Sequence, residues 1–198
     1  MKKHIIAIGL IFIVPLIMQA ATPNSPAPDF KESASSGKQY SLDELKGKWV
    51  VLEWYNKDCP YVKKHYGSKN MQKLQKTYTQ KGVVWLSIIS SAKGKQGYLT
   101  ASEAQNIKKQ AGSNASDILL DVDGNMGKAY GAKTTPHMYV INPKGTLVYA
   151  GGIDDNNSAN PKVIPDSKNF VVAALEQAMN GKKVTTPQAK PYGCSVKY

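Results

Sequence analysis

Residues 49–62 read WVVLEWYNKDCPYV. The first seven are mostly apolar at consecutive positions, which is typical of a strand covered on both faces of a sheet. Cys59 then precedes Pro60, and proline is favoured in the first turn of a helix because its missing N–H is not needed there. We therefore predict a strand over 49–55 and a helix that begins near residue 60, with a cysteine at its N-terminus.

Strand and helix patterns alternate through the rest of the chain. The predicted strands cover residues 49–55, 83–89, 118–120, 138–141 and 146–149; the predicted helices cover residues 60–80, with an interruption near Gly67, 102–111, 125–130 and 170–179. Alternating units followed by a hairpin and a last helix predict an α/β protein with a mixed central sheet and helices on both faces.

Three segments carry a resemblance to a known family: APDF at 27–30, LKGKWVVL at 45–52 and YGAKTTPHMYVI at 130–141. Over roughly residues 27–180 the chain resembles the thioredoxin-like redoxin superfamily (AhpC-TSA, peroxiredoxin-like). It looks most like the branch that keeps only the first cysteine of C-x-x-C, because Val62 stands where the second would be. The resemblance implies a thioredoxin fold.

The two ends of the chain differ from this domain. Residues 1–21 have the basic start, apolar run and small residues of an export signal, and the rival interpretation, a retained anchor, needs about 20 apolar residues. We predict a bacterial periplasmic or secreted protein without stable membrane insertion after cleavage. A Pro-rich lead-in over 22–28, too short and polar to pack, precedes a single domain over 29–180, and a tail over 181–198 carries Cys194.

Cys59 is the candidate nucleophile. Unpaired N–H groups and the dipole at a helix N-terminus stabilise a thiolate there. Lys57, Lys63 and Lys64 would lower the thiol pKa further, whereas Asp58 would raise it. The alternative interpretation is that Cys59 is a small buried apolar residue.

Other candidate residues follow from the same segments. Glu53 lies in an apolar strand, so its pKa should rise, and the resemblance implies a buried acid that exchanges protons with the thiols. An edge-facing or lysine-paired Glu53 is the alternative. The resemblance also implies that Thr135 and Pro136 form a cis-proline loop that docks substrate. We expect Trp54 to pack around this site, although core packing alone would explain it.

Two other chemistries fit poorly. Peroxiredoxins use P-x-x-x-T-x-x-C and a distant arginine, but Leu52 and Asn56 replace the Pro and Thr, and the chain contains no arginine. For a metal, Cys59 with His65 or His137 makes a poor cage. We expect no metal and no other cofactor.

Cys194 is the second cysteine of an exported chain, where pairing is the default. A lone Cys59 cannot release a mixed disulfide, so Cys194 is the candidate resolving thiol. A permanent disulfide staple and pairing with another molecule are equally open at this point.

These residues predict an exported thiol-disulfide oxidoreductase with Cys59 as nucleophile, resolved by Cys194. Its partners would be protein or small-molecule thiols and disulfides and an external reductant. A non-enzymatic binding protein with a structural disulfide and a thiol peroxidase are the alternatives. The net charge of +12 comes from scattered lysines without arginine, which argues against nucleic-acid binding.

Overall fold

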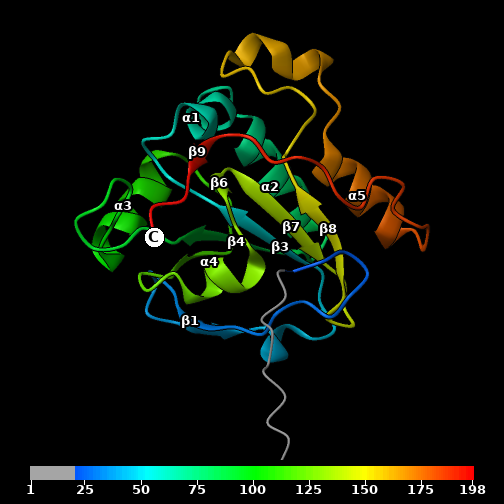
Figure 1. Cartoon of the computed structure of the whole chain (residues 1–198), viewed down its shortest axis with the longest axis horizontal. Helices are drawn as coiled ribbons and strands as arrows, with labels where there is room; N and C mark the ends of the chain where they lie inside the picture. Colours follow the sequence, from blue (N-terminus) through cyan, green and yellow to red (C-terminus); the bar gives the residue numbers. More distant parts are fainter. Residues whose placement is uncertain (1–20) are drawn as a thin grey trace, which may run out of the picture.

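The computed structural model describes residues 21–198, and its centre is a mixed sheet of five strands in the order β5-β4-β3-β7-β8 (Figure 1). These strands are β3 (Val50–Trp54), β4 (Val84–Ile89), β5 (Asp117–Leu120), β7 (His137–Ile141) and β8 (Leu147–Gly151). Strands β3, β4 and β5 are parallel, whereas β7 runs antiparallel to both β3 and β8. The predicted succession of strands along the chain and the predicted mixed central sheet are confirmed.

Five α-helices surround the sheet: α1 (Pro60–Gly67), α2 (Asn70–Gln80), α3 (Ala101–Gln110), α4 (Asn125–Tyr130) and α5 (Phe170–Met179). Helices α2 and α5 pack on one face of the sheet, and α4 packs on the other (Figure 1). The predicted helix over 60–80 is interrupted as expected, because Lys69 adopts a left-handed conformation with φ of 62° between α1 and α2.

Smaller elements complete the chain. They are the hairpin of β1 (Lys31–Ser33) and β2 (Gln39–Ser41), the 3-10 helices η1 (Asp43–Leu45) and η2 (Pro161–Asp166), and the strand pair β6 (Thr134–Thr135) and β9 (Cys194–Ser195). Within residues 21–198, every helix is too short or too polar to cross a membrane. Residues 1–20 of the predicted export signal lie outside the described part.

The lead-in over 22–28 corrects a prediction. It is not an unpacked tether, because the amide of Asn24 donates to the carbonyl of Leu147 at 2.7 Å and the amide of Ala27 donates to that of Gly145 at 2.9 Å. Ala27 is also buried. The segment packs because its backbone pairs with the β7–β8 hairpin, a contact that composition does not reveal.

The tail over 181–198 crosses the domain (red in Figure 1). It first pairs with β8, where the amide of Ala189 donates to the carbonyl of Ala150 at 3.2 Å. It then forms β9 against β6, and the amide of Val196 donates to the carbonyl of Lys133 at 3.1 Å. This path carries Cys194 to the end of the sheet where α1 begins.

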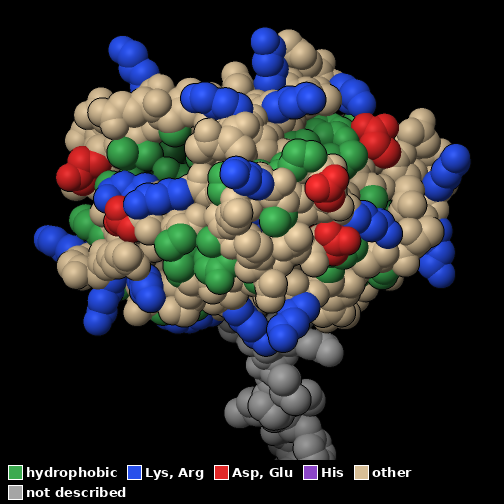
Figure 2. All heavy atoms as spheres, turned by 90° about the horizontal axis from the view of Figure 1, so that it is seen from above, with side chains coloured by type: hydrophobic (Ala, Val, Ile, Leu, Met, Phe, Trp, Pro, Cys, Tyr) green, Lys and Arg blue, Asp and Glu red, His purple; other side chains and the backbone are tan. Residues whose placement is uncertain are grey.

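The surface seen from above carries lysine side chains spread over the whole view, with hydrophobic patches between them (Figure 2). They do not gather into a stripe on this face. The distribution agrees with the scattered lysines of the sequence and with their interpretation as solvated surface charge.

Candidate active site

Cys59 lies where β3 passes into α1. It is the N-cap residue of α1, with Pro60 in the first turn. The carbonyl oxygen of Cys59 accepts a hydrogen bond from the amide of Lys63 at 2.9 Å. Its side chain is completely buried, and the thiol donates a hydrogen bond to the carbonyl oxygen of Thr135 at 3.0 Å. The strand-to-helix pattern of the sequence thus places the sulfur at a helix N-terminus.

Thr135 contacts both cysteines of this site, Cys59 through its carbonyl oxygen and Cys194 through strand pairing. The peptide bond between Thr135 and Pro136 is cis, and Thr135 pairs with Cys194 across the antiparallel β6–β9 ladder. The approach of the tail is close at Gly193, whose φ is 135°. A Cβ at this position would lie 2.1 Å from the Thr135 oxygen, so only glycine fits there.

The two cysteines are free thiols that meet at Thr135. The Cys59 sulfur lies 3.0 Å from the Thr135 carbonyl oxygen, and Cys194 pairs with Thr135 in the β6–β9 ladder and packs against the apolar cluster that contains Cys59. Burial raises the pKa of the Cys59 thiol, but hydrogen bonds from the Cys194 thiol, the Val62 amide and Thr135 together bring that pKa below its usual value. Burial and the neighbouring Cys59 sulfur raise the pKa of Cys194 to about 11. The pair therefore divides into an acidic thiol and a thiol that keeps its proton.

The lysines near Cys59 play a different part from the predicted one. Lys57 pairs with Asp58 at 2.8 Å, and Lys64 is buried with its ammonium 3.3 Å from the Asp154 carboxylate. Hydrogen bonds, not these charges, are the main causes that lower the Cys59 pKa. The prediction failed because Lys57 and Lys64 each have a carboxylate partner of their own, and the side chain of Lys63 is exposed to solvent.

Glu53 is completely buried in the middle of β3. Its carboxylate accepts hydrogen bonds from four neutral side chains: Trp85 at 2.8 Å, Tyr66 at 2.9 Å, Gln75 at 3.1 Å and Ser87 at 3.4 Å. Burial raises its pKa, and the hydrogen bonds offset only part of that rise. The alternative of an edge-facing or lysine-paired Glu53 is wrong, because β3 is the central strand and all four of these donors are uncharged.

Two aromatic side chains connect Glu53 to the apolar cluster that contains Cys59. The ring of Tyr66, whose hydroxyl donates to Glu53, packs at 5.3 Å on the ring of Tyr55. Tyr55 belongs to the apolar cluster that contains Cys59 and Val62. Glu53 is thus connected to the cluster around the thiol through Tyr66 and Tyr55.

Trp54 is not a site residue, and this corrects a prediction. It is completely buried on the opposite face of the sheet, where it packs against Tyr130 and Tyr139. Its indole N–H donates to the hydroxyl of Ser90 at 2.8 Å. Successive side chains of a strand point to opposite faces, so Trp54 points away from its neighbour Glu53.

Both candidate histidines are buried and hydrogen-bonded. His65 lies 3.1 Å from the Tyr192 hydroxyl, and burial lowers the pKa of its imidazole to about 4. His137 lies 3.1 Å from the Tyr139 hydroxyl, and burial lowers its pKa to about 3. Residues 21–198 contain no group of three or more His, Cys, Asp or Glu side chains placed to hold a metal ion.

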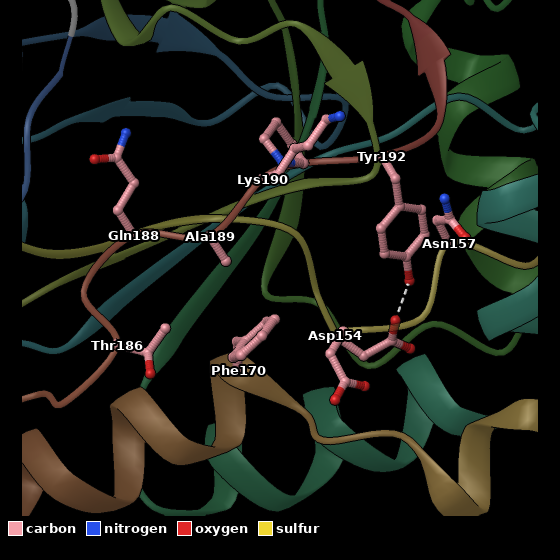
Figure 3. Close-up of a pocket in the computed structure, with 10 residues that line it drawn as sticks. Asp154, Asn157, Phe170, Thr186, Gln188, Ala189, Lys190 and Tyr192 are labelled. Carbon is pink, nitrogen blue, oxygen red and sulfur yellow. Dashed lines mark hydrogen bonds between the residues drawn. The ribbon is translucent and has the colours of Figure 1, made fainter.

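A buried charged cluster beside the site was missed from the sequence. Tyr192 donates to Asp154 at 2.5 Å (Figure 3). The Lys64 ammonium donates to the carbonyl of Asn156 at 2.8 Å. A cavity of about 520 Å³ opens between the tail and the segment that contains Asp154. Local sequence gave no signal for the cluster, because Lys64 resembles the other lysines and Asp154 lies in a polar, irregular stretch.

The chain is similar to known proteins in sequence and in fold. A family model described as the AhpC/TSA family matches residues 23–150. The thiol-disulfide oxidoreductase ResA of Bacillus subtilis (strain 168) is 28% identical over 130 residues, which are 66% of this chain and 67% of ResA. The chain spans about two thirds of the length of the curated relatives that it matches first.

Two solved structures are similar in fold. A hypothetical protein from Sinorhizobium meliloti 1021 has a TM-score of 0.75 at 23% identity, with 91% of this chain and 96% of that one covered. The thioredoxin domain of a thiol-disulfide oxidoreductase from Bacteroides vulgatus has a TM-score of 0.53 at 16% identity, with 74% of this chain and 98% of that one covered. The predicted thioredoxin fold, with its mixed sheet and helices on both faces, is confirmed.

Proposed function

Since the chain belongs to the AhpC/TSA family, we propose that it is a thiol-disulfide oxidoreductase in which Cys59 is the nucleophile and Cys194 the resolving thiol. The observation that carries the proposal is that two free thiols meet at one residue: the Cys59 thiol lies 3.0 Å from the Thr135 carbonyl oxygen, and the β6–β9 ladder holds Cys194 on Thr135. The similarity to a thiol-disulfide oxidoreductase supports it.

The reaction runs in two exchanges. The Cys59 thiolate attacks one sulfur of a substrate disulfide, so a bond forms between them, the substrate S–S bond breaks, and the other substrate sulfur leaves as a thiolate that takes up a proton. Cys194 then loses its proton and attacks the Cys59 sulfur. The Cys59–Cys194 disulfide forms and the second substrate sulfur leaves. Two electrons pass to the substrate, and an external dithiol reductant restores the protein.

The thiol pKa values favour this order. In the reduced protein Cys194 stays protonated. A hydrogen bond from its thiol to the Cys59 sulfur stabilises the attacking thiolate. Once Cys59 is part of a mixed disulfide, its negative charge is gone. The hydrogen bond to Cys59 and the repulsion from its negative charge, which both raise the pKa of Cys194, are then lost. The resolving thiol therefore becomes more acidic at the step in which it attacks.

Thr135 and Pro136 are the proposed substrate-docking residues. In the resting state Thr135 is already paired with Cys194, and Cys59 is completely buried. A substrate disulfide therefore reaches Cys59 only when β9 moves, and an extended substrate backbone then takes its place on β6.

Glu53 is the proposed proton shuttle. Its burial and raised pKa support this role, since an acid with a raised pKa exchanges protons closer to neutral pH. Export to the periplasm or the exterior belongs to the same proposal. The basic, apolar and small-residue pattern of residues 1–21 supports it.

The test is turnover of insulin disulfides together with non-reducing peptide mass spectrometry. We expect Cys59→Ser to abolish turnover and Cys194→Ser to accumulate mixed disulfides on Cys59. After exposure to glutathione disulfide, the wild type should contain a Cys59–Cys194 crosslink. Turnover that is indifferent to Cys59→Ser would refute the enzyme, and turnover with no crosslink would refute Cys194 as resolving thiol. Consumption of hydrogen peroxide under the same conditions would indicate a thiol peroxidase instead of a thiol-disulfide oxidoreductase.

A further inference from the structure

The ladder that presents Cys194 is very short. Strands β6 and β9 contribute two residues each. Isolated two-stranded pairs are at best marginally stable in water. The position of Cys194 against Cys59 therefore depends on contacts outside the ladder.

Tyr192, two residues before Cys194, makes such a contact with a buried carboxylate, Asp154 (Figure 3). Its hydroxyl donates to Asp154 at 2.5 Å and lies 3.1 Å from His65 and 3.4 Å from the Lys64 ammonium. Asp154, His65 and Lys64 are all buried. A hydrogen bond to a charged, buried group is worth more than one between neutral groups on the surface.

Helix α1 supplies most of this anchor. Lys64 and His65 belong to α1, and the ring of Tyr61 packs at 5.7 Å on the ring of Tyr192. The same helix begins at Cys59. One rigid element thus holds both the nucleophile and the residue that fixes the approach of the resolving thiol.

We propose that Tyr192 is a positioning residue for Cys194, and that its hydroxyl, held by Asp154 and the α1 side chains Lys64 and His65, keeps the resolving thiol on Cys59. The inference rests on the proposed function. It identifies a residue that touches neither sulfur and acts through the path of the tail.

Such a residue sets the effective concentration of Cys194 at Cys59. The quantity to measure is the equilibrium in which the protein dithiol and glutathione disulfide give the protein disulfide and two molecules of glutathione. Tyr192→Phe keeps the ring contact with Tyr61 and removes the hydroxyl. We expect the equilibrium constant to fall about tenfold, as the loss of a charged hydrogen bond implies.

A second readout is the pKa of Cys59, followed by the ultraviolet absorbance of its thiolate. Because the Cys194 thiol lowers that pKa in the wild type, Tyr192→Phe should move it upward. The matched control is Tyr130→Phe, which removes a hydroxyl whose hydrogen-bond acceptor, the carbonyl of Pro28 at 2.7 Å, belongs to the N-terminal lead-in and not to the tail. The control should leave both the equilibrium and the Cys59 pKa unchanged.

Asp154→Asn provides a second variant that removes the charge of the acceptor and should shift both readouts in the same direction. Wild-type values in folded Tyr192→Phe, or equal shifts in Tyr130→Phe, would overturn the positioning role. These results differ from failure of the proposed function, in which the wild type itself forms no Cys59–Cys194 disulfide with glutathione disulfide. That result would remove the inference as well.

Discussion

Gly193→Ala should release the tail from the site. The residue has a φ of 135°, and a Cβ would lie 2.1 Å from the oxygen and 2.8 Å from the carbon of the Thr135 carbonyl. Backbone atoms cannot rotate away as a side chain does. The strained conformation alone costs about 1–3 kcal/mol. With the contact included, we expect the substitution to destabilise the closed tail by about 3 kcal/mol. This free energy shifts the equilibrium about 100-fold from the closed tail toward the open tail.

The assay is alkylation of Cys59 by iodoacetamide, followed by mass spectrometry and compared with the rate in urea-unfolded protein. Cys59 is completely buried in the closed form, so its protection should fall about 100-fold in Gly193→Ala. Gly181→Ala is the matched control, because Gly181 also has a positive φ, 71°, but open space around it. Wild-type protection of Cys59 in Gly193→Ala would refute the reasoning that the tail covers the thiol.

Three further predictions concern the core and the thiol pair. The pKa of Glu53 in the native state is raised above its usual value of 4.5, so the free energy of unfolding should increase as the pH falls through that raised pKa toward 4.5. Glu53→Gln should abolish this increase, which urea unfolding at a series of pH values measures. Trp54→Ala should lower the free energy of unfolding by about 3–5 kcal/mol, yet leave the alkylation rate of Cys59 in the folded protein unchanged. A Cys59–Cys194 disulfide closes a loop of roughly 135 residues, so the oxidised protein should be up to about 5 kcal/mol more stable than the reduced one in urea; equal stabilities would contradict an unstrained pairing.

The position of the nucleophile could be predicted because local signals specify it. Consecutive apolar residues define β3, and Pro60 marks the first turn of α1, so Cys59 must lie at the junction. Runs without alternation do not say which side chain faces which layer. The strand was therefore predicted correctly, whereas Trp54 was expected to pack around the site and instead lies in the core on the opposite face of the sheet.

The rest of the site depends on contacts between distant segments. Lys64 and Asp154 are 90 residues apart, and each looks like an ordinary surface charge until the fold buries them together. The same holds for Cys194, whose sequence context indicates a turn but not its neighbour. Sequence reasoning left three roles open for Cys194: a resolving thiol, a permanent disulfide staple or a pairing with another molecule. The β6–β9 ladder supplies the geometry on which the reversible pairing is now proposed.

The β6–β9 ladder also bears on self-association. When β9 leaves, β6 presents unpaired backbone groups, and such an edge accepts any extended strand of suitable register. A second copy carries the same β9 sequence with the same cysteine, so its backbone groups match the edge equally well. Intramolecular closure wins only while the effective concentration of a copy's own tail exceeds the protein concentration. We therefore expect concentrated, partly opened protein to form reciprocal strand-swapped dimers, with each Cys194 beside the other copy's Cys59.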